Sequence, residues 1–460
     1  MTTAVSSLIS RNPADPTDVL VSIPAPGAFA AVDAVERARV AQPGWLNGGA
    51  AARSASLGAV AAAVEAAADE LAALAVREVG KPLTEARAEV ARSAAIWRYY
   101  AQAPYEPTGQ VHEPATGQGL LLSRRRPYGV AGLITPWNFP FAIPSWKAAP
   151  ALAAGNAVVL KPAPEATACA RRLAEIVQQA LPAGVFTVLP GGATEGNALV
   201  SDADVVSFTG SSAVGQAVAR AATARGVPVQ AEMGGLNAAI VLPDADIGQA
   251  ATHIAASIAG FAGQKCTATS RVIAVGAAHA PLREALTDAL RSLPVGDPAD
   301  PATVCGPLIS EHARGQVADA WHGLRALAGG TVPDGPGWYA SPTLVEQVSP
   351  GHRLLREEVF GPVAALLPAD DLAHAVRITN SVPYGLVTSV HTTDLDAALG
   401  GLDRIDTGMI RINAPSTGVD FHLPFGGAKA SSHGPREQGR AALEFYTSSR
   451  TYTLSPAKAM

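Results

Sequence analysis

The sequence is short of cysteine and of charge, and it has no long apolar run. Only three of its 460 residues are cysteine, which gives almost no support for a disulfide framework. Charged residues make up 16% of the chain, and the net charge of −5 comes without a long basic block, so a dedicated surface for nucleic acid or an anionic membrane is not expected. No uninterrupted apolar stretch reaches the roughly 18 residues that a membrane span requires. The N-terminus also lacks the basic start and apolar run of a secretory signal, so we expect a cytoplasmic protein.

What the chain does have is length and alanine. A chain of 460 residues is too long for a single hydrophobic core, which predicts two or three domains. Hydrophobic residues make up 48% of it, and the excess is mostly alanine, which suits buried helices. Apolar residues recur at roughly helical spacing over 51–76 and again over 83–103. The first hundred residues are therefore predicted to be mostly helical.

After residue 128, short apolar runs alternate with turns and helix-like segments. The runs lie at 130–134, 157–160, 186–189 and 205–208. Strands that alternate with helices predict parallel βαβ units of the dinucleotide-binding kind. A second alternating series begins near residue 237, with predicted strands at 238–242, 271–275 and 363–367. Two α/β domains in sequence are the simplest interpretation.

Cys266 is the candidate nucleophile. It stands among small residues in GQKCTATS at 263–270, which leaves room for a substrate to approach the sulfur. Taken alone, a cysteine in an apolar chain is more often an inert packing residue. Cys169 and Cys305 lack the setting of Cys266, and for them the packing interpretation stands.

Two polar residues could assist such a nucleophile. Glu232, in QAEMGG, follows an apolar run and precedes two glycines; a carboxylate in a partly desolvated cleft has a raised pKa, which suits a general base for water. Asn138, in PWNFP, could donate its amide to the negative oxygen that forms when a thiolate adds to a carbonyl. The alternatives are a solvated surface glutamate and an ordinary turn at PWNFP, since Asn and Pro both favour turns.

Two further segments could meet a nucleotide. FTGSSAVG at 208–215 follows a predicted strand and opens a predicted helix, where a pyrophosphate can lie against free backbone N–H groups. Its glycine pattern is not G-x-G-x-x-G, so a plain tight turn is equally consistent with it. Lys161 closes a predicted strand and could reach a ribose or a phosphate, as could any exposed lysine.

Together these segments resemble the aldehyde dehydrogenase superfamily. Seven of the family's recurring segments occur in order, and they extend the resemblance from about residue 11 to residue 453. They read PWNFP at 136–140, KPAPE at 161–165, FTGS at 208–211, EMGG at 232–235, GQKC at 263–266, EEVFGPV at 357–363 and PFGG at 424–427. Chance agreement of seven ordered segments is negligible.

The resemblance implies a role for each matching residue. The catalytic set would be Cys266 as nucleophile, Glu232 as general base, Asn138 as oxyanion donor together with the Cys266 backbone N–H, and Lys147 and Glu437 on a proton path. The cofactor contacts would be Thr135, Trp137, Lys161, Gly192, Gly210, Ser211, Glu358 and Phe360. The substrate pocket would include Phe141, Trp146, Lys265, Thr267 and Phe421. No metal is expected.

The implied reaction oxidises an aldehyde to a carboxylic acid through a thiohemiacetal and a thioester on the cysteine. Glu232 favours hydrolysis of the thioester, because members that pass the acyl group to coenzyme A typically lack this glutamate. The cofactor is NAD or NADP: many NAD-preferring members have a glutamate three residues after the lysine, where this chain has Pro164, with Glu165 one step later.

The implied substrate is a small-molecule aldehyde, and the cues to its kind disagree. The C-terminal texture over 418–439 is similar to the branch that acts on 2-oxoglutarate semialdehyde, and Lys265 and the run Arg124-Arg125-Arg126 could attract an anion. The aromatic side chains expected in the pocket would instead suit an aromatic or aliphatic aldehyde. Of the two, we expect an acidic semialdehyde.

The implied architecture is the aldehyde dehydrogenase fold, an α/β fold with a Rossmann-like cofactor domain, an α/β catalytic domain and a small β oligomerisation hairpin. The expected divisions are a cofactor domain over 1–231 with 111–128 in the bridging hairpin, a catalytic domain over 232–420, and a return to the cofactor domain with an oligomerisation tail over 421–460. A homodimer or homotetramer would follow. The N-terminus is shorter than in many relatives, which suggests that an initial strand pair is missing.

Two rival interpretations remain. A thiol hydrolase or acyltransferase would usually need a histidine to activate Cys266, and no histidine stands in a recognisable partner motif. A non-catalytic structural member of the superfamily, of the kind that fills vertebrate lenses, would not need to keep Cys266, Glu232 and Asn138 together.

Overall fold

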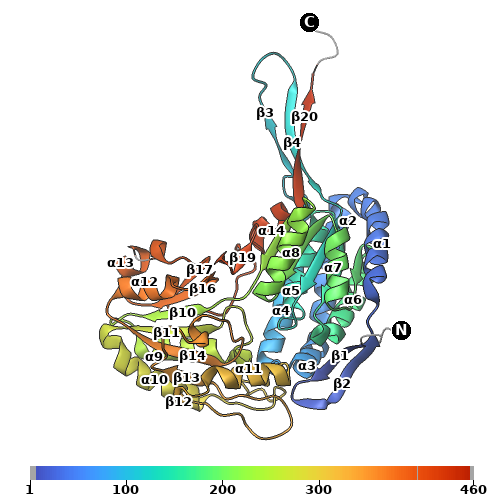
Figure 1. The fold of residues 1–460 in the computed structure, drawn as a ribbon. Helices are drawn as coiled ribbons and strands as arrows, with labels where there is room; N and C mark the ends of the chain where they lie inside the picture. The colour runs from blue at the N-terminus through green and yellow to red at the C-terminus, as the bar shows by residue number, and fades with distance from the viewer. Residues whose placement is uncertain (1–6, 401, 456–460) are drawn as a thin grey trace.

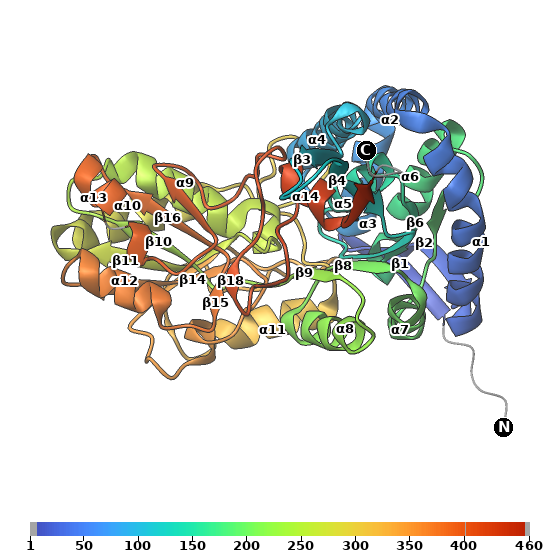
Figure 2. The same cartoon turned by 90° about the horizontal axis from the view of Figure 1, so that it is seen from above.

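The computed structural model describes residues 7–400 and 402–455, and its main parts are two mostly parallel sheets covered by helices and a projecting β arm (Figure 1). Seen from above, the sheets form two lobes, which β9 and the long segment after β17 connect (Figure 2). This arrangement confirms the prediction of an α/β fold. Among the described residues, no helix combines the length and the hydropathy that crossing a membrane would need.

The first sheet has six strands in the order β19-β9-β8-β5-β6-β7. Its strands are β5 (Val130–Thr135), β6 (Ala157–Pro162), β7 (Phe186–Val188), β8 (Val205–Thr209), β9 (Val229–Glu232) and β19 (Ser432–His433). The helices between them are α5 (Ala142–Ala153), α6 (Thr167–Ala180), α7 (Ala193–Asp202) and α8 (Ser212–Ala224). The strands β5 to β9 are parallel, and β19 is antiparallel to β9. Every residue of β5, β6 and β8 is buried, as expected for parallel strands that helices cover on both faces.

The strand order of this sheet reverses between β5 and β8. The chain first adds β6 and β7 on one side of β5 and then places β8 and β9 on the other side. A reversal of this kind leaves a crevice at the carboxyl ends of the strands, where ligands of open α/β sheets bind.

Four helices precede the first sheet, namely α1 (Gly27–Asn47), α2 (Gly49–Ala66), α3 (Ala68–Val79) and α4 (Leu83–Tyr100). In α2 the buried residues Leu57, Val60, Ala61 and Val64 follow helical spacing, which confirms the prediction of a helical N-terminal region.

A strand pair, β1 (Ser7–Asn12) and β2 (Asp15–Pro24), lies before these helices and is antiparallel. The suggestion that an initial strand pair is missing was therefore wrong. The pair is held because β1 buries Leu8, and because the Ser10 hydroxyl donates to Glu78 of α3 at 2.6 Å.

The second sheet has seven strands in the order β12-β13-β14-β11-β10-β16-β17, all parallel except β12. Its strands are β10 (Asn237–Val241), β11 (Thr269–Val275), β12 (Arg325–Ala328), β13 (Thr343–Glu346), β14 (Val363–Ala369), β16 (Val387–His391) and β17 (Met409–Ile412). Its helices are α9 (Ile247–Ala259), α10 (His279–Ser292), α11 (Glu311–Trp321), α12 (Leu372–Asn380) and α13 (Leu395–Gly400). A short pair, β15 (Tyr384–Gly385) and β18 (Ala428–Lys429), lies beside this sheet.

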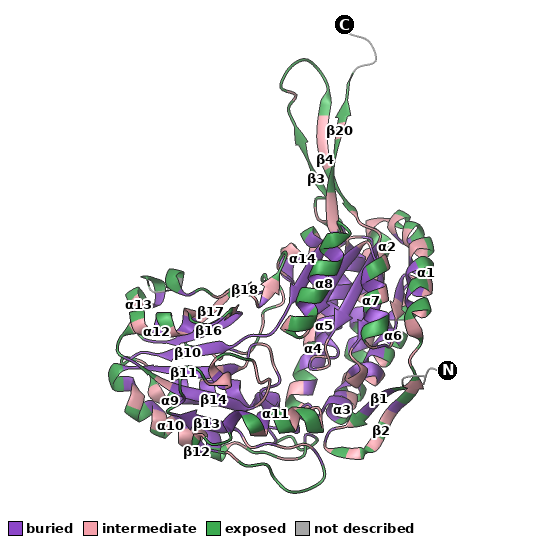
Figure 3. Cartoon of the chain, in the orientation of Figure 1, coloured by how far each residue is buried: buried purple, intermediate pink, exposed green. Residues whose placement is uncertain are grey.

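The arm is a three-stranded antiparallel sheet of β3 (Gly109–His112), β4 (Leu120–Pro127) and β20 (Thr447–Leu454), and α14 (Gly439–Phe445) leads into it. It projects from the first sheet, and most of its residues are exposed (Figure 3). Arg124, Arg125 and Arg126 lie on β4 in this arm.

Candidate active site

A cavity lies where the strand order reverses, between β5 and β8. It has a volume of ≈ 730 Å³, begins at the carboxyl ends of these strands and extends to Cys266 and to residues 358–360 of the second lobe. All eight residues expected to contact a cofactor line it, namely Thr135, Trp137, Lys161, Gly192, Gly210, Ser211, Glu358 and Phe360. Thr209, from the predicted FTGS segment, lines it as well, and so do Asn197 and Gln316, which lie in none of the segments singled out from the sequence. Gln316 comes from α11, and only the tertiary structure brings that helix to the cavity.

The N-terminus of α8 can receive a phosphate group. Ser211 stands at its N-cap in extended conformation, and no side chain satisfies the first N–H groups of the helix. The buried hydroxyls of Thr135, Thr209 and Ser212 have no hydrogen-bond partner among the described residues. Free amides at a helix N-terminus and unpaired hydroxyls suit an anionic pyrophosphate, so the residues present fit a dinucleotide.

Lys161 lies at the other side of this cavity. Its Nζ donates to the backbone oxygens of Pro162 at 2.7 Å and Gly191 at 2.9 Å. Burial lowers its pKa to about 8, against the opposing effect of Glu165 and Glu195. Its ammonium is therefore held in place and remains able to meet a ribose hydroxyl or a phosphate.

Glu358 and Phe360 enclose the end of the cavity nearest Cys266. Glu358 Oε1 accepts the Gly235 N–H at 3.1 Å, and a Cβ on Gly234 would lie 1.8 Å from Glu358 Oε2, so a larger residue there would displace the Glu358 carboxylate. Burial raises the pKa of Glu358 to about 7, and the Gly235 N–H opposes that rise. Phe360 has a left-handed φ of 54° and packs its ring edge-on against Trp137 at 5.8 Å between centroids.

Cys266 follows a strained turn. Phe261 (φ 52°) and Ala262 (φ 52°) are left-handed although neither is glycine, and a conformation of this kind persists only where its surroundings enforce it. The Cys266 carbonyl accepts Asn237 Nδ2 at 2.8 Å, and its thiol is partly exposed to the cavity. Burial raises the pKa of the thiol to about 12, and the carboxylates of Glu358, Glu232 and Glu437 add to that rise.

Asn138 lies beside this turn and lines the same cavity as Cys266. It is 3% exposed, and its Nδ2 donates to the Gln264 carbonyl at 2.9 Å. Gln264 is held in turn, because its Oε1 accepts the Ile309 N–H at 2.8 Å. An amide nitrogen has two N–H donors, so one remains for an oxygen that develops negative charge near the sulfur.

Glu232 ends β9 and does not itself line the cavity. Its Oε2 accepts the Ser432 hydroxyl at 2.5 Å, and its Oε1 has no partner among the described residues. Burial raises its pKa well above the usual range, and Glu437 adds to this, whereas Ser432, Lys147 and Arg436 oppose it. A carboxyl that holds its proton this firmly has the basicity that a general base for water needs.

Lys147 and Glu437 form a buried ion pair behind Glu232. The Lys147 ammonium also donates to the Ser207 hydroxyl at 2.7 Å, and Glu437 Oε2 accepts Trp146 Nε1 at 2.8 Å. Burial lowers the pKa of Lys147, and Glu437 opposes that shift. The pair can therefore hold or pass a proton without contact with solvent.

The five residues expected in the substrate pocket do not line the cofactor cavity. Phe141 is fully buried at the start of α5, and the Trp146 ring lies 5.9 Å from that of Phe425. Thr267 is buried, and the Phe421 ring meets Tyr99 of α4 at 5.7 Å. Lys265 is already paired with Glu85, at 2.7 Å.

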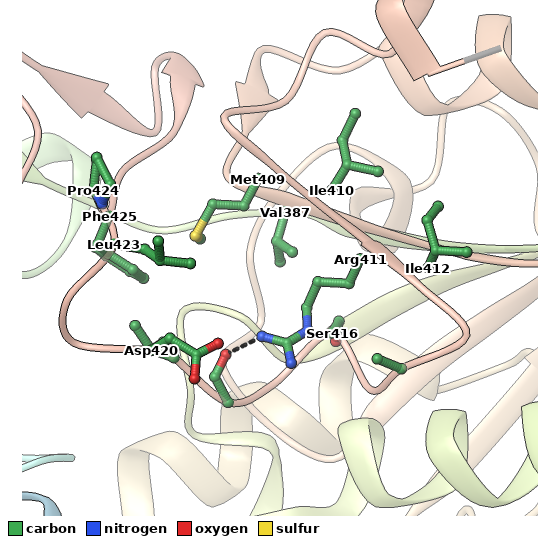
Figure 4. A pocket seen from close by; sticks show the side chains of 13 residues that line it. Val387, Met409, Ile410, Arg411, Ile412, Ser416, Asp420, Leu423, Pro424 and Phe425 are labelled. Atoms are coloured by element: carbon green, nitrogen blue, oxygen red, sulfur yellow. Dashed lines mark hydrogen bonds between the residues drawn. The ribbon is translucent and has the colours of Figure 1, made fainter. Parts of the chain in front are cut away.

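A second cavity, of ≈ 380 Å³, lies between β17 and the loop that follows it (Figure 4). Arg411 points into it from β17 and donates to the Gly418 carbonyl, with Asp420 close by. None of the residues expected at the active site lines it. It connects to the segment that carries Cys266 through Ser416, whose hydroxyl donates to the Thr267 carbonyl at 2.7 Å.

The sequence and the fold were compared with those of known proteins, and the similarity extends over nearly the whole chain. The model of the aldehyde dehydrogenase family matches residues 2–452. The alpha-ketoglutaric semialdehyde dehydrogenase of Bacillus subtilis is 39% identical over 461 aligned positions, which cover 97% of this chain and 94% of that protein. The alpha-ketoglutarate semialdehyde dehydrogenase of Haloferax volcanii is 38% identical over 96% of this chain and 94% of its own length. The crystal structure of an NAD-dependent aldehyde dehydrogenase from Sinorhizobium meliloti is similar with a TM-score of 0.94 at 34% identity, covering 99% of this chain and 92% of that one.

Proposed function

The chain belongs to the aldehyde dehydrogenase family and is an NAD(P)-dependent aldehyde dehydrogenase, and we propose that Cys266, Asn138 and Glu232 carry its chemistry. The observation that carries this proposal is that Cys266 and Asn138 line one cavity with all eight expected cofactor residues. Membership of the family argues against a cofactor-free thiol hydrolase. The presence of Cys266, Glu232 and Asn138 together argues against a purely structural member of the family.

In the first step the Cys266 sulfur, once deprotonated, adds to the aldehyde carbon. The free N–H of the Asn138 amide and the backbone N–H of Cys266 stabilise the oxyanion that forms. A nicotinamide dinucleotide in the cavity supplies the acceptor for the hydride that leaves this carbon. Cys266 then carries the acyl group as a thioester.

In the second step Glu232 removes a proton from water, the water oxygen attacks the thioester, and the carbon–sulfur bond breaks to release the acid. The high pKa of Glu232 supports this role. We propose that Lys147 and Glu437 hold the proton that Glu232 passes back, since their pair is buried beside it and influences its pKa.

We propose an acidic semialdehyde as the substrate, which the names of the two relatives support. Lys265 is a poor partner for its carboxylate, because Glu85 already meets its charge. Arg92 is a better one. It lies on α4 midway between Glu85 and Tyr99, and residues seven apart share a helix face. Glu85 contacts Lys265, and Tyr99 contacts Phe421, whereas Arg92 makes no hydrogen bond or ion pair with the described part of the chain.

The alternative, an aromatic or aliphatic aldehyde, is supported by Phe141, Trp146 and Phe421.

We also propose how the chain divides by function. Residues 1–231 form the cofactor domain, residues 232–420 form the catalytic domain, and residues 421–460 return to the cofactor domain and end in the arm. We also propose that the arm pairs subunits into a homodimer or homotetramer. In its sheet β20 is an edge strand of eight residues, and long exposed edges favour pairing with another chain. Light scattering on the purified protein would measure the mass of the assembly.

The activity is tested by following the reduced-nicotinamide absorbance with NAD and NADP in parallel and a panel of acidic semialdehydes, aliphatic aldehydes and benzaldehydes. Reduction that Cys266→Ser abolishes supports the proposed roles and identifies both the cofactor and the substrate class. Full activity in Cys266→Ser would reject Cys266 as the nucleophile.

A further inference from the structure

A buried ion pair outside the proposed machinery lies between the two loops that carry Asn138 and Cys266. It joins Lys81, at the turn before α4, to Glu89 within α4. Lys81 is 0% exposed and Glu89 is 3% exposed. Burying two charges is costly, and replacing such a pair by apolar residues is often neutral or stabilising, so stability alone is a weak reason for its presence.

The Lys81 ammonium contacts one aromatic ring from each loop. Its Nζ lies 3.7 Å from the centroid of the Phe139 ring and 4.8 Å from that of the Phe261 ring. Phe139 is the residue after Asn138, and Phe261 is the first of the two left-handed residues that precede Cys266. A cation between two ring faces attracts both, and it does so most strongly where water is excluded.

Glu89 holds the same region through the backbone. Its Oε1 accepts the N–H groups of Phe141 at 2.8 Å and Ala142 at 2.9 Å, while its Oε2 meets Lys81. These N–H groups stand at the start of α5, which has no capping side chain of its own. Glu89 thus caps α5 from another helix and fixes the chain directly after the Asn138 loop, about one and a half helical turns before Lys147.

A hydrogen bond from Asn138 Nδ2 to the Gln264 carbonyl connects the Asn138 loop to the Cys266 loop. The turn at Phe261 and Ala262 is strained, so it needs an external contact to keep its form. Lys81 provides one such contact, and the Trp137 ring, 6.1 Å from that of Phe261, provides another.

We propose that Lys81 and Glu89 are positioning residues that set the Asn138 amide against the Cys266 sulfur, and so set the rate at which the tetrahedral oxyanion forms and collapses. This inference rests on the proposed roles of Cys266 and Asn138. Neither Lys81 nor Glu89 reacts or contacts the cofactor cavity.

The chain contains a matched control. Glu78 of α3 caps α6 as Glu89 caps α5, because its carboxylate accepts the N–H groups of Ala168 at 2.6 Å and Cys169 at 2.7 Å. It is equally buried, but α6 carries none of the proposed catalytic residues. Glu78→Gln therefore removes a buried capping charge without touching the two loops.

The test is the burst of reduced cofactor in the first turnover, measured in the full-length enzyme at saturating aldehyde and cofactor. In the double variant Lys81→Met/Glu89→Gln, methionine keeps the volume of the lysine stem, and the amide oxygen of the introduced glutamine can still cap α5. We expect the burst amplitude and the cofactor affinity to remain, and the burst rate to fall at least about tenfold, since small misplacements of reacting groups are costly. Glu78→Gln should keep the wild-type burst rate.

A burst rate within about twofold of the wild type in the double variant would overturn the proposal, and so would an equal slowing in Glu78→Gln. If the double variant does not fold, Phe139→Leu is the variant to test. It leaves the ion pair and the cap of α5 intact but removes the aromatic ring nearer to Lys81. A burst rate slowed roughly fivefold supports the proposal, and an unchanged burst rate overturns it. Failure of the proposed function looks different, because Cys266→Ser alone would then still give a burst.

Discussion

The Glu232 carboxylate and the Ser432 hydroxyl are hydrogen-bonded across the β9–β19 pair, with 2.5 Å between Oε2 and Oγ. The two residues are 200 positions apart in the chain. Burial and Glu437 raise the pKa of Glu232, and this hydrogen bond opposes the rise because it stabilises the charged form. Ser432 therefore helps to set how much of Glu232, the proposed general base, is ionised near neutral pH.

Removing that hydroxyl should shift the pH profile of thioester hydrolysis. In Ser432→Ala the pKa of Glu232 rises further, so the acid limb of the deacylation rate moves to higher pH by about one unit. The pH dependence of steady-state turnover, where deacylation limits, measures this shift. Ser449→Ala, on the exposed arm, is the control and should leave the profile unchanged. If the acid limb of Ser432→Ala stays at the wild-type pH, Ser432 does not influence the pKa of Glu232.

Glu232→Gln should separate the two halves of the reaction. Cys266 and Asn138 remain, so the enzyme should still release about one equivalent of reduced cofactor per site and then stop at the thioester. Stopped-flow absorbance records the burst, and mass spectrometry of the stalled enzyme detects the acyl group on Cys266. Turnover at the wild-type rate would remove Glu232 from the mechanism.

Glu358 should control the reactivity of the nucleophile before cofactor binds. After burial, its carboxylate is the largest contributor to the raised pKa of Cys266. In Glu358→Gln the pKa of Cys266 falls, so alkylation by iodoacetamide at pH 8 should accelerate by roughly threefold to tenfold. The pKa of Glu358 is itself about 7, so the wild type and the variant should converge below that pH, where the carboxyl is protonated. Glu357→Gln, an exposed neighbour, should behave as the wild type; equal rates for Glu358→Gln and the wild type at pH 8 would contradict this coupling.

Arg92→Met should distinguish acidic from neutral aldehydes. If Arg92 meets the carboxylate of the substrate, KM for an acidic semialdehyde rises at least about tenfold, whereas KM for a neutral aldehyde of similar length stays the same. The control is Arg98→Met on the same helix, since Arg98 is exposed and paired with Glu65. If KM rises equally for both kinds of aldehyde, Arg92 affects the pocket in general and does not bind the carboxylate of the substrate.

His391 should make the fold sensitive to acid. Burial, with His253 at 5.8 Å between ring centroids, lowers the pKa of His391 from 6.5 to about 4 in the folded state. The unfolded state therefore takes up the proton first, and the stability that neutral His391 gives is complete above about pH 6.5 and is lost as the pH falls toward 4, by about 3 kcal/mol at most. The Tm of the wild type should drop more than that of His391→Gln between pH 7.5 and pH 5. His322→Gln, which alters an exposed ring, should drop as the wild type does.

The cofactor half of the site could be predicted because its residues belong to short local segments. Lys161, Ser211 and Glu358 each lie in a contiguous motif, and each motif begins or ends at a strand or helix terminus that the apolar pattern also predicts. The parallel order of the first sheet brings Lys161 and Ser211 to one edge, whereas Glu358 precedes β14 of the second sheet and reaches the cavity only through the packing of the two lobes.

The substrate half could not be predicted in the same way. Lys265 stands beside the nucleophile in the sequence, yet its charge is met by Glu85, 180 positions away. The arginine run at 124–126 lies on the arm, where β4 pairs with β20. Whether a charge is free to meet a ligand depends on which other charge lies within a few ångströms, and local sequence does not contain that information.

The sequence by itself determined the family and the alternation of strands and helices, and it indicated the candidate nucleophile and the cofactor segments, because these depend on residue types at fixed short spacings. Only the tertiary structure decided that β1 and β2 form, that Glu232 is paired with Ser432, and that Lys81 and Glu89 lie between the loops of Asn138 and Cys266. Each of these contacts joins segments that are distant in the chain, and their energies come from burial and from charges in a medium without water, which exist only after the chain has folded.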